Sequence, residues 1–348
     1  MADTLQQNEL QETFCRLGFV TSSSLMLPVL GQARKAAEAS DITILIEGET
    51  GTGKQVIARA IHELDRKRRA FPFITVHCST ISEALAESEL FGHQRGAFSG
   101  AVAERKGLFQ AANHGTLLLD DVNDLPSHLQ PKLLDVVQRG VVRAVGSDRE
   151  TRIDVRIIAA CNQPLEPLVR DGRFRSDLYH RLNVVKLMLP PLRERGDDLA
   201  QLMLSLARRH SSLYGPIESI DSSLLAQLAT RPFPGNIREL ENAVQRMLFV
   251  KTSGSSLGLA DWKAQAQAQV KAEGPAASDP YADAADAMWK VIMHLGVPYA
   301  EAFQEIEKRV LEAAINTHGT TRREIAQRLH TSERTLYYKM RSHGLGNT

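Results

Sequence analysis

Four apolar runs alternate with helical patterns in the first half of the chain. The runs cover residues 42–48, 71–78, 115–122 and 155–161, and each contains consecutive apolar residues rather than an apolar residue at every second position. Continuous apolar runs are typical of a parallel sheet that helices cover on both faces. Residues 55–64 have helical spacing after the first run. This order predicts an α/β subdomain over residues 19–190.

The second half of the chain has helical patterns. Apolar residues recur at helical spacing in two stripes, Leu199, Leu202, Met203 and Leu206 in one and Leu224, Leu225, Leu228 and Ala229 in the other. These stripes predict a helical subdomain over residues 191–251. Residues 252–287 are rich in Gly, Ser, Ala and Gln, which predicts a linker with room for one short helix. Residues 288–348 are helical again, and residues 1–18 are expected to form a tail or one short helix.

Length, charge and cysteine usage limit the class of protein. The 348 residues suffice for two or three domains, and a formal net charge of +1 means that contact with nucleic acid needs a local basic patch. Cys15, Cys78 and Cys161 lie far apart, which argues against a disulfide framework or a zinc site and fits reduced thiols. The sequence has neither a signal peptide nor an apolar run long enough to span a bilayer. It therefore predicts a cytoplasmic protein with no membrane association.

A glycine-rich stretch follows the first apolar run and precedes the first helix. It reads Gly48-Glu49-Thr50-Gly51-Thr52-Gly53-Lys54. The glycines let backbone N–H groups converge on phosphate oxygens, the helix N-terminus favours negative charge, and the lysine reaches the β- and γ-phosphates. The stretch predicts an ATP site. Gln55 follows it, where the general pattern has the Ser or Thr whose hydroxyl holds Mg²⁺.

The third apolar run ends in two carboxylates, Asp120 and Asp121. Ligands gather at the carboxyl ends of the strands in open α/β sheets. Asp120 is therefore a candidate ligand of Mg²⁺, and Asp121 is a candidate to polarise the attacking water. The alternative is that both carboxylates only cap the following turn.

Several motifs in order give a resemblance to a known family. The chain resembles the AAA+ ATPase domain of bacterial enhancer-binding proteins, which activate RNA polymerase carrying sigma-54. The resemblance extends from about residue 19 to residue 250 and includes GETGTGK, ESELFGHQRGAFSGA, GTLLLDDV, FRSDLYHRLNV, LPPLRERGDD and FPGNIRELENAV. The C-terminal segment separately resembles the Fis-type helix-turn-helix that ends such activators. The resemblance implies an AAA+ P-loop fold, with a parallel sheet between helices, an α-helical lid and an all-α DNA-binding domain.

The resemblance implies roles for the matching residues. Asp120 and Asp121 match the Walker B acids, Asn162 matches the sensor of the γ-phosphate, and Arg175 and Arg181 match arginine fingers that reach a neighbouring subunit's site. A guanidinium at the γ-phosphate stabilises the charge that develops as the bond to ADP breaks. The implied ATP-binding set is Gly48, Glu49, Thr50, Gly51, Thr52, Gly53, Lys54, Gln55 and, as the second sensor, Arg238.

The loop with Gly96, Ala97, Phe98, Ser99, Gly100 and Ala101 matches the family's sigma-54 contact. Gly96 and Gly100 bracket Phe98, so the backbone can turn sharply and present the aromatic ring at the tip. The alternative is a glycine-rich surface turn without a partner. Ser99 keeps the hydroxyl of the family's Thr, and Phe233, in place of the usual Trp, is expected to act in packing only.

Two departures from the family pattern affect the chemistry. Asp121 stands in place of the usual Glu, and His77 in place of the Asn that holds this Glu inactive in the family. The side chain of Asp121 is one methylene shorter than that of Glu, which displaces the catalytic carboxylate. A displacement of about 1 Å can lower the rate of the catalysed reaction about a hundredfold. We hypothesise that His77 and Asp121 form a substitute switch pair, with slow hydrolysis that depends on pH because His titrates near neutrality. The rival is a site that binds ATP and barely hydrolyses it.

The end of the chain predicts a helix, a short turn and a second helix. Six basic and two acidic residues follow residue 320, a local charge of +4 that suits phosphates. Thr331 or Ser332 is expected to cap the second helix. The candidate DNA contacts are Arg322, Arg323, Ser332, Glu333, Arg334, Thr335, Tyr338 and Lys339. The alternative is a helical dimer cap with charged faces.

These features predict an ATP-dependent activator that binds upstream enhancer DNA and the sigma-54 RNA polymerase holoenzyme. As a homo-oligomer it would assemble from dimer to hexamer, because the fingers act on a neighbour's phosphate. The first 18 residues are too short for a regulatory domain, so a separate regulatory protein, expression level or a nucleotide-like ligand is expected to control it. One alternative is a DNA-binding repressor or co-activator that uses ATP only for assembly. Another is a protein-remodelling ATPase unrelated to transcription.

Overall fold

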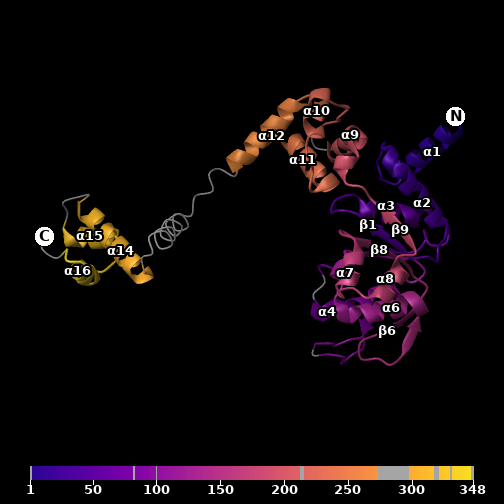
Figure 1. The fold of residues 1–348 in the computed structure, drawn as a ribbon, viewed down its shortest axis with the longest axis horizontal. Helices are drawn as coiled ribbons and strands as arrows, with labels where there is room; N and C mark the ends of the chain where they lie inside the picture. The colour runs from indigo at the N-terminus through magenta and orange to yellow at the C-terminus, as the bar shows by residue number, and fades with distance from the viewer. Residues whose placement is uncertain are drawn as a thin grey trace. The chain divides into compact units, whose positions relative to one another are not determined.

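The chain forms two compact units, residues 1–268 and 269–348. The computed structural model describes residues 2–80, 83–98, 100–211, 215–272, 298–316, 321–329 and 331–345 (Figure 1). Among these residues, the helices are all too short or too polar to cross a bilayer.

A five-stranded parallel sheet lies at the centre of the first unit. Its strands, in spatial order, are β2 (Phe73–His77), β5 (Thr116–Asp120), β8 (Arg156–Cys161), β1 (Ile44–Glu47) and β9 (Val185–Met188). Four of these strands lie in the four predicted apolar runs, and β9 was not predicted. The parallel α/β fold is confirmed.

Helices cover both faces of this sheet (Figure 1). One face packs against α1 (Ala2–Arg16), α2 (Leu27–Glu38) and α3 (Lys54–Leu64). The other packs against α4 (Glu83–Phe91), α5 (Leu108–Ala111), α6 (Gln130–Arg139), α7 (Leu165–Arg170) and α8 (Ser176–Leu182). Phe14 of α1 is fully buried in the first of these cores. The N-terminal residues therefore form a packed helix, the second of the two predicted alternatives.

Short elements complete the α/β part. Two hairpins pair β3 (Gly92–His93) with β4 (Arg105–Lys106) and β6 (Val141–Arg143) with β7 (Glu150–Arg152). The 3-10 turns are Ser24–Met26, Val122–Asp124, Ser127–Leu129, Leu192–Glu194 and Gly196–Asp198.

The lid is a helical subdomain with its own core. It contains α9 (Leu199–His210), β10 (Ser219–Ile220), α10 (Ser222–Ala229), α11 (Asn236–Val250), β11 (Ser256–Leu257) and α12 (Leu259–Ala272). Both predicted apolar stripes face this core except for Ala229, which is exposed, and Phe233 is buried in the core. The packing continues beyond residue 251, the predicted end, because Trp262 of α12 joins the core and buried Gln265 accepts a hydrogen bond from Arg246 Nε at 3.1 Å. The later part of the predicted linker, residues 273–287, lies outside the described residues.

The second unit contains α14 (Tyr299–Asn316), α15 (Arg322–Arg328) and α16 (Glu333–Ser342). Its core is formed by Leu311, Ile325, Ala326, Leu336 and Met340. Ser332 caps α16, since its hydroxyl accepts from the backbone N–H of Thr335 at 3.0 Å. The helix, turn and helix predicted for this segment are confirmed, with Ser332 as the cap.

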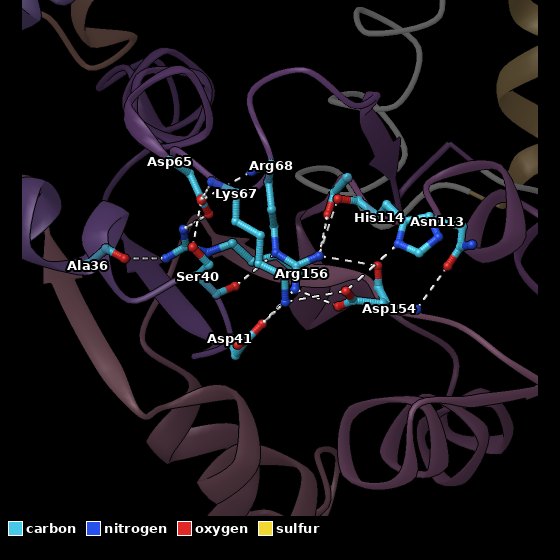
Figure 2. Close-up of polar contacts among 11 residues, drawn as sticks. Ala36, Ser40, Asp41, Asp65, Lys67, Arg68, Asn113, His114, Asp154 and Arg156 are labelled. Carbon is cyan, nitrogen blue, oxygen red and sulfur yellow. Dashed lines mark hydrogen bonds and ion pairs between the residues drawn. The ribbon is translucent and has the colours of Figure 1, made fainter.

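A polar network closes the amino-terminal edge of the sheet, the edge opposite the glycine-rich loop (Figure 2). Figure 2 shows Arg68 and Arg156 side by side at its centre. Arg156 Nη1 lies 2.7 Å from Asp65 Oδ2, and both side chains are completely buried. Arg68 Nη2 lies 2.6 Å from Asp154 Oδ1. Asp65 and Arg68 follow α3, and Asp154 and Arg156 lie at the start of β8. Arg68 also pairs with Asp41, just before β1. The network therefore ties together elements that carry the site on the other edge.

Candidate nucleotide site

The glycine-rich loop connects the end of β1 to the start of α3. Gly51 and Gly53 have φ values of +80° and +101°, which side chains other than glycine rarely adopt. A Cβ on Gly51 would lie 2.2 Å from the carbonyl oxygen of Gly235, in the lid. The lid thus packs directly on the loop, and Gly51 has to be glycine for both reasons.

Lys54 is the first residue of α3, and its ammonium is turned back into the loop. Nζ donates to the carbonyl oxygens of Gly48 at 2.7 Å and Glu49 at 3.0 Å. Burial lowers the pKa of this lysine, and the nearby carboxylates of Asp120 and Asp121 oppose that shift. The ammonium therefore lies between the loop and the two carboxylates. A phosphate group bound at the loop would lie next to it.

Asp120 is the last residue of β5 and is only 7% exposed. Its Oδ2 accepts a hydrogen bond from Gln55 Nε2 at 2.8 Å, and His77 Nδ1 lies 3.2 Å from the same oxygen. The predicted partner of His77 was Asp121, so that prediction is corrected. The sheet register explains the difference, because His77 of β2 is directly beside Asp120 of β5.

Asp121 follows the strand and turns away from its direction. Its φ of +53° is in the left-handed region, which Asp tolerates better than most residues. Burial is the main cause that raises the pKa of this carboxyl, and the charge of Asp120 adds to it. Asp121 is therefore a better proton acceptor than an exposed aspartate.

A cavity of about 260 Å³ lies between the glycine-rich loop and the lid. Its lining combines the loop, both carboxylates, the apolar residues Phe19, Val20, Leu202 and Leu206, and Arg238. The loop is tied to the lid by Glu49, whose two carboxylate oxygens accept from Arg193 at 2.7 and 2.8 Å. Arg193 and then Asn236 lower the pKa of Glu49 to about 2. Apolar walls with a phosphate loop at one end suit a nucleotide.

Family comparisons agree with this geometry. The sigma-54 interaction domain matches residues 19–188, the AAA+ ATPase lid domain matches residues 193–279, and the Fis family of bacterial regulatory proteins matches residues 302–343. The chain is 38% identical over 327 residues to the regulatory protein AtoC of Escherichia coli K12, covering 94% of this chain and 68% of AtoC.

The chain belongs to the sigma-54 enhancer-binding regulators.

Two further comparisons place the regulator in this family. It is 46% identical over 239 residues to the transcriptional regulatory protein GlrR of E. coli K12, covering 68% of this chain and 53% of GlrR. The crystal structure of NtrX from Brucella abortus in complex with ATP matches with a TM-score of 0.63 and 29% identity, over 94% of this chain and 69% of NtrX. The regulator thus spans about two thirds of AtoC and about half of GlrR.

Three predicted catalytic residues, Asn162, Arg175 and Arg181, do not line the regulator's own cavity. Asn162 follows β8 and lines a separate recess together with Gly48 and Glu49. Arg175 and Arg181 lie at the start and end of α8 and are exposed, and Arg175 Nη2 pairs with Asp177 at 2.8 Å. Neither arginine lines the cavity of its own chain.

A partly buried polar network that local sequence patterns did not indicate contacts α8, the helix with these arginines. Glu47, just before the glycine-rich loop, is 1% exposed, and its Oε2 lies 2.9 Å from Lys186 Nζ of β9. Lys186 also pairs with Glu166 of α7 at 2.6 Å, and the hydroxyl of Tyr179 of α8 donates to Glu166 at 2.8 Å. Lys186 is the main cause that lowers the pKa of Glu166 to about 2. These contacts join residues that are far apart in the sequence, so local patterns gave no signal for them.

The loop of residues 96–101 is an outward turn on the α/β part. The backbone N–H of Gly96 donates to the carbonyl oxygen of Ala101 at 2.8 Å and closes the turn. Phe98 is 40% exposed, and its ring lies edge-on to the ring of His93 with centroids 5.0 Å apart. Ala101 is buried, and Ser99 lies outside the described residues. The turn therefore presents a partly exposed aromatic ring that packs against His93.

The candidate DNA contacts of the regulator lie on α15, α16 and the turn between them. All eight side chains are exposed: Arg322, Arg323, Ser332, Glu333, Arg334, Thr335, Tyr338 and Lys339. Lys339 and His343 both contact Glu307 of α14 and lower the pKa of its carboxyl, with His343 the larger cause. DNA phosphates would compete with Glu307 for Lys339.

Proposed function

We propose that the regulator is an ATP-dependent activator of sigma-54 RNA polymerase in the cytoplasm. The observation that carries the proposal is an ATP-type cavity and an exposed Phe98 loop in one compact unit, residues 1–268, of a chain of this family. Hydrolysis at the carboxyl edge of the sheet would move the loop against sigma-54. The second unit would hold the regulator on upstream enhancer DNA through its exposed basic residues.

The cavity residues fit ATP and Mg²⁺. The glycine-rich loop and Lys54 would hold the β- and γ-phosphates, and Arg238 would lie beside them. Asp120 offers a carboxylate oxygen, the ligand type that Mg²⁺ prefers. The described residues contain no cluster of three or more metal-ligating side chains. Asp120 and the phosphates of ATP would therefore bind the ion together. When bound, Mg²⁺ neutralises charge on these phosphates, and Asp121 would orient the attacking water.

We further propose that catalysis requires neighbouring subunits, from dimer to hexamer. Arg175 and Arg181 are exposed on α8 and absent from the lining of their own cavity. Arg175 or Arg181 would therefore reach a γ-phosphate bound to another copy rather than one in its own cavity. Asn162, next to the loop, would sense the phosphate from the subunit's own side.

Replacement of Phe98 by alanine tests the proposed function. We expect Phe98→Ala to hydrolyse ATP at the rate of the unmodified chain, because Phe98 lies outside the cavity, and to lose open-complex formation with sigma-54 polymerase on promoter DNA. Val102→Ala is the matched control, since Val102 is 81% exposed just beyond the loop. Open complexes formed equally by Phe98→Ala and the unmodified chain would refute the role of the loop.

Replacement of Asp121 by glutamate tests whether the short side chain of Asp121 limits ATP hydrolysis. We expect Asp121→Glu to raise the rate of ATP hydrolysis by about tenfold to a hundredfold, because a displacement of about 1 Å changes rates on that scale. The assay is steady-state phosphate release, for Asp121→Glu alone and together with His77→Asn. Negligible hydrolysis by the unmodified chain, with intact ATP-dependent assembly and DNA binding, would instead favour the second candidate, a DNA-binding regulator that uses ATP for assembly. The observation behind that candidate is the short Asp121 side chain.

A further inference from the structure

We propose that Gln55 and His77 are positioning residues for the magnesium ion. They hold Asp120 by one carboxylate oxygen and leave the other for the cation, and so set the affinity of the site for the metal. This inference rests on the proposed binding of ATP with Mg²⁺.

The two contacts meet at one atom. Gln55 Nε2 lies 2.8 Å and His77 Nδ1 3.2 Å from Asp120 Oδ2. Among the described residues, Asp120 Oδ1 has no hydrogen-bond donor, and Asp120 lines the nucleotide cavity. One oxygen is therefore occupied by the protein and the other is left for a ligand.

The chemistry of the groups fixes the direction of the hydrogen bond from Gln55. An ionised carboxylate only accepts, so the amide must turn its nitrogen toward Asp120 and keep its oxygen away from it. His77 makes a second polar contact with the same oxygen, through Nδ1 at 3.2 Å. Both contacts therefore fall on Oδ2.

The contacts also come from three separate elements. Gln55 is in the first turn of α3, His77 ends β2 and Asp120 ends β5. The β2–β5 register puts His77 and Asp120 side by side, and α3 begins where the loop leaves β1. Rotation of a carboxylate about its last torsion angle is otherwise broad, so one hydrogen bond and one further polar contact on the same oxygen favour one orientation.

This arrangement gives Gln55 a role at a position where the general pattern has Ser or Thr. A Ser or Thr would give the ion a hydroxyl ligand, whereas the amide of Gln55 donates to Asp120. Asp120 is then the protein ligand on which the ion depends most. Loss of a group that orients a metal ligand typically weakens metal binding by about tenfold to a hundredfold.

The experiment measures metal affinity without turnover. The full chain is saturated with ADP, and binding of Mn²⁺, as a paramagnetic substitute for Mg²⁺, is followed by the loss of the free-ion EPR signal. Gln55→Met removes the amide donor at similar length, and His77→Phe removes the Nδ1 contact while keeping a ring. We expect each variant to weaken Mn²⁺ binding by about tenfold or more. Glu63→Gln, an exposed change at the far end of α3, is the matched control and should leave it unchanged.

Two further readouts separate the possible failures. ADP affinity without metal and the thermal unfolding midpoint should match the unmodified chain in both variants, which shows that the pocket and fold are intact. Variants that bind Mn²⁺ as tightly as the unmodified chain would overturn the inference and leave the proposed function standing. Failure of the unmodified chain to bind ADP or ATP at all would overturn both.

Discussion

ATP hydrolysis falls by about a thousandfold or more when Arg181 or Arg175 is replaced by alanine, and ATP binding is retained. This is the expected result because arginine fingers contribute about 10³- to 10⁵-fold to the rate of phosphoryl transfer. Both arginines are exposed and lie away from the cavity of their own chain, so their loss leaves the binding residues in place. Phosphate release and equilibrium binding of a fluorescent ATP analogue measure the two effects. Arg173→Ala, an exposed change just before α8, is the matched control.

Mixed oligomers show whether these arginines act on a neighbour. Arg181→Ala subunits keep an intact cavity and lack the finger, whereas Lys54→Ala subunits lack the phosphate lysine and keep the finger. A mixture of the two should regain hydrolysis, because each Arg181→Ala cavity can receive an arginine from a Lys54→Ala neighbour. Mixed assemblies that form and stay inactive would contradict action between subunits, and loss of ATP binding by Arg181→Ala would place the arginine in its own site.

The sequence predicted those parts of the site that follow one another along the chain. The apolar run at residues 42–48, the glycine-rich loop and the helix from residue 54 are consecutive, so local rules are enough to place them. The pair Asp120 and Asp121 was placed at the carboxyl edge for the same reason. Strand β9 was not predicted because it is a short edge strand of four residues, and one of these residues is the charged Lys186.

Contacts between distant elements were not predictable in the same way. The partner of His77 depends on the register between β2 and β5, and a change of one residue decides between Asp120 and Asp121. The network of Glu47, Lys186 and Glu166 joins three elements that no local pattern relates. The lid boundary was set too early because α12 packs a partly buried Trp262 and a buried Gln265 against the lid, in a segment whose composition is typical of a linker.

The network at the amino-terminal edge makes a prediction about stability (Figure 2). We expect Arg156→Met to lower the free energy of unfolding by about 3–5 kcal/mol, the usual effect of removing one partner from a buried ion pair. Arg156 is the donor to Asp65 Oδ2, whereas Oδ1 keeps Ser40 Oγ and the backbone N–H groups of Lys67 and Arg68. The variant therefore leaves one buried carboxylate oxygen without its cation. Chemical denaturation followed by circular dichroism measures the change, and Arg69→Met, an exposed neighbour, is the control.

A double variant separates the cost of the orphaned charge from the loss of the pair itself. Arg156→Met with Asp65→Leu replaces both charges by apolar groups, and such replacements of buried pairs are often neutral or stabilising. We expect the double variant to recover most of the stability lost in Arg156→Met, reduced by the donors that Asp65 leaves behind at Ser40 and Arg68. If Arg156→Met is as stable as the Arg69→Met control, the network does not hold the strands in place. Since β5 and β8 carry Asp120 and Asn162 at their other ends, a destabilised network should also weaken ATP binding before the chain unfolds.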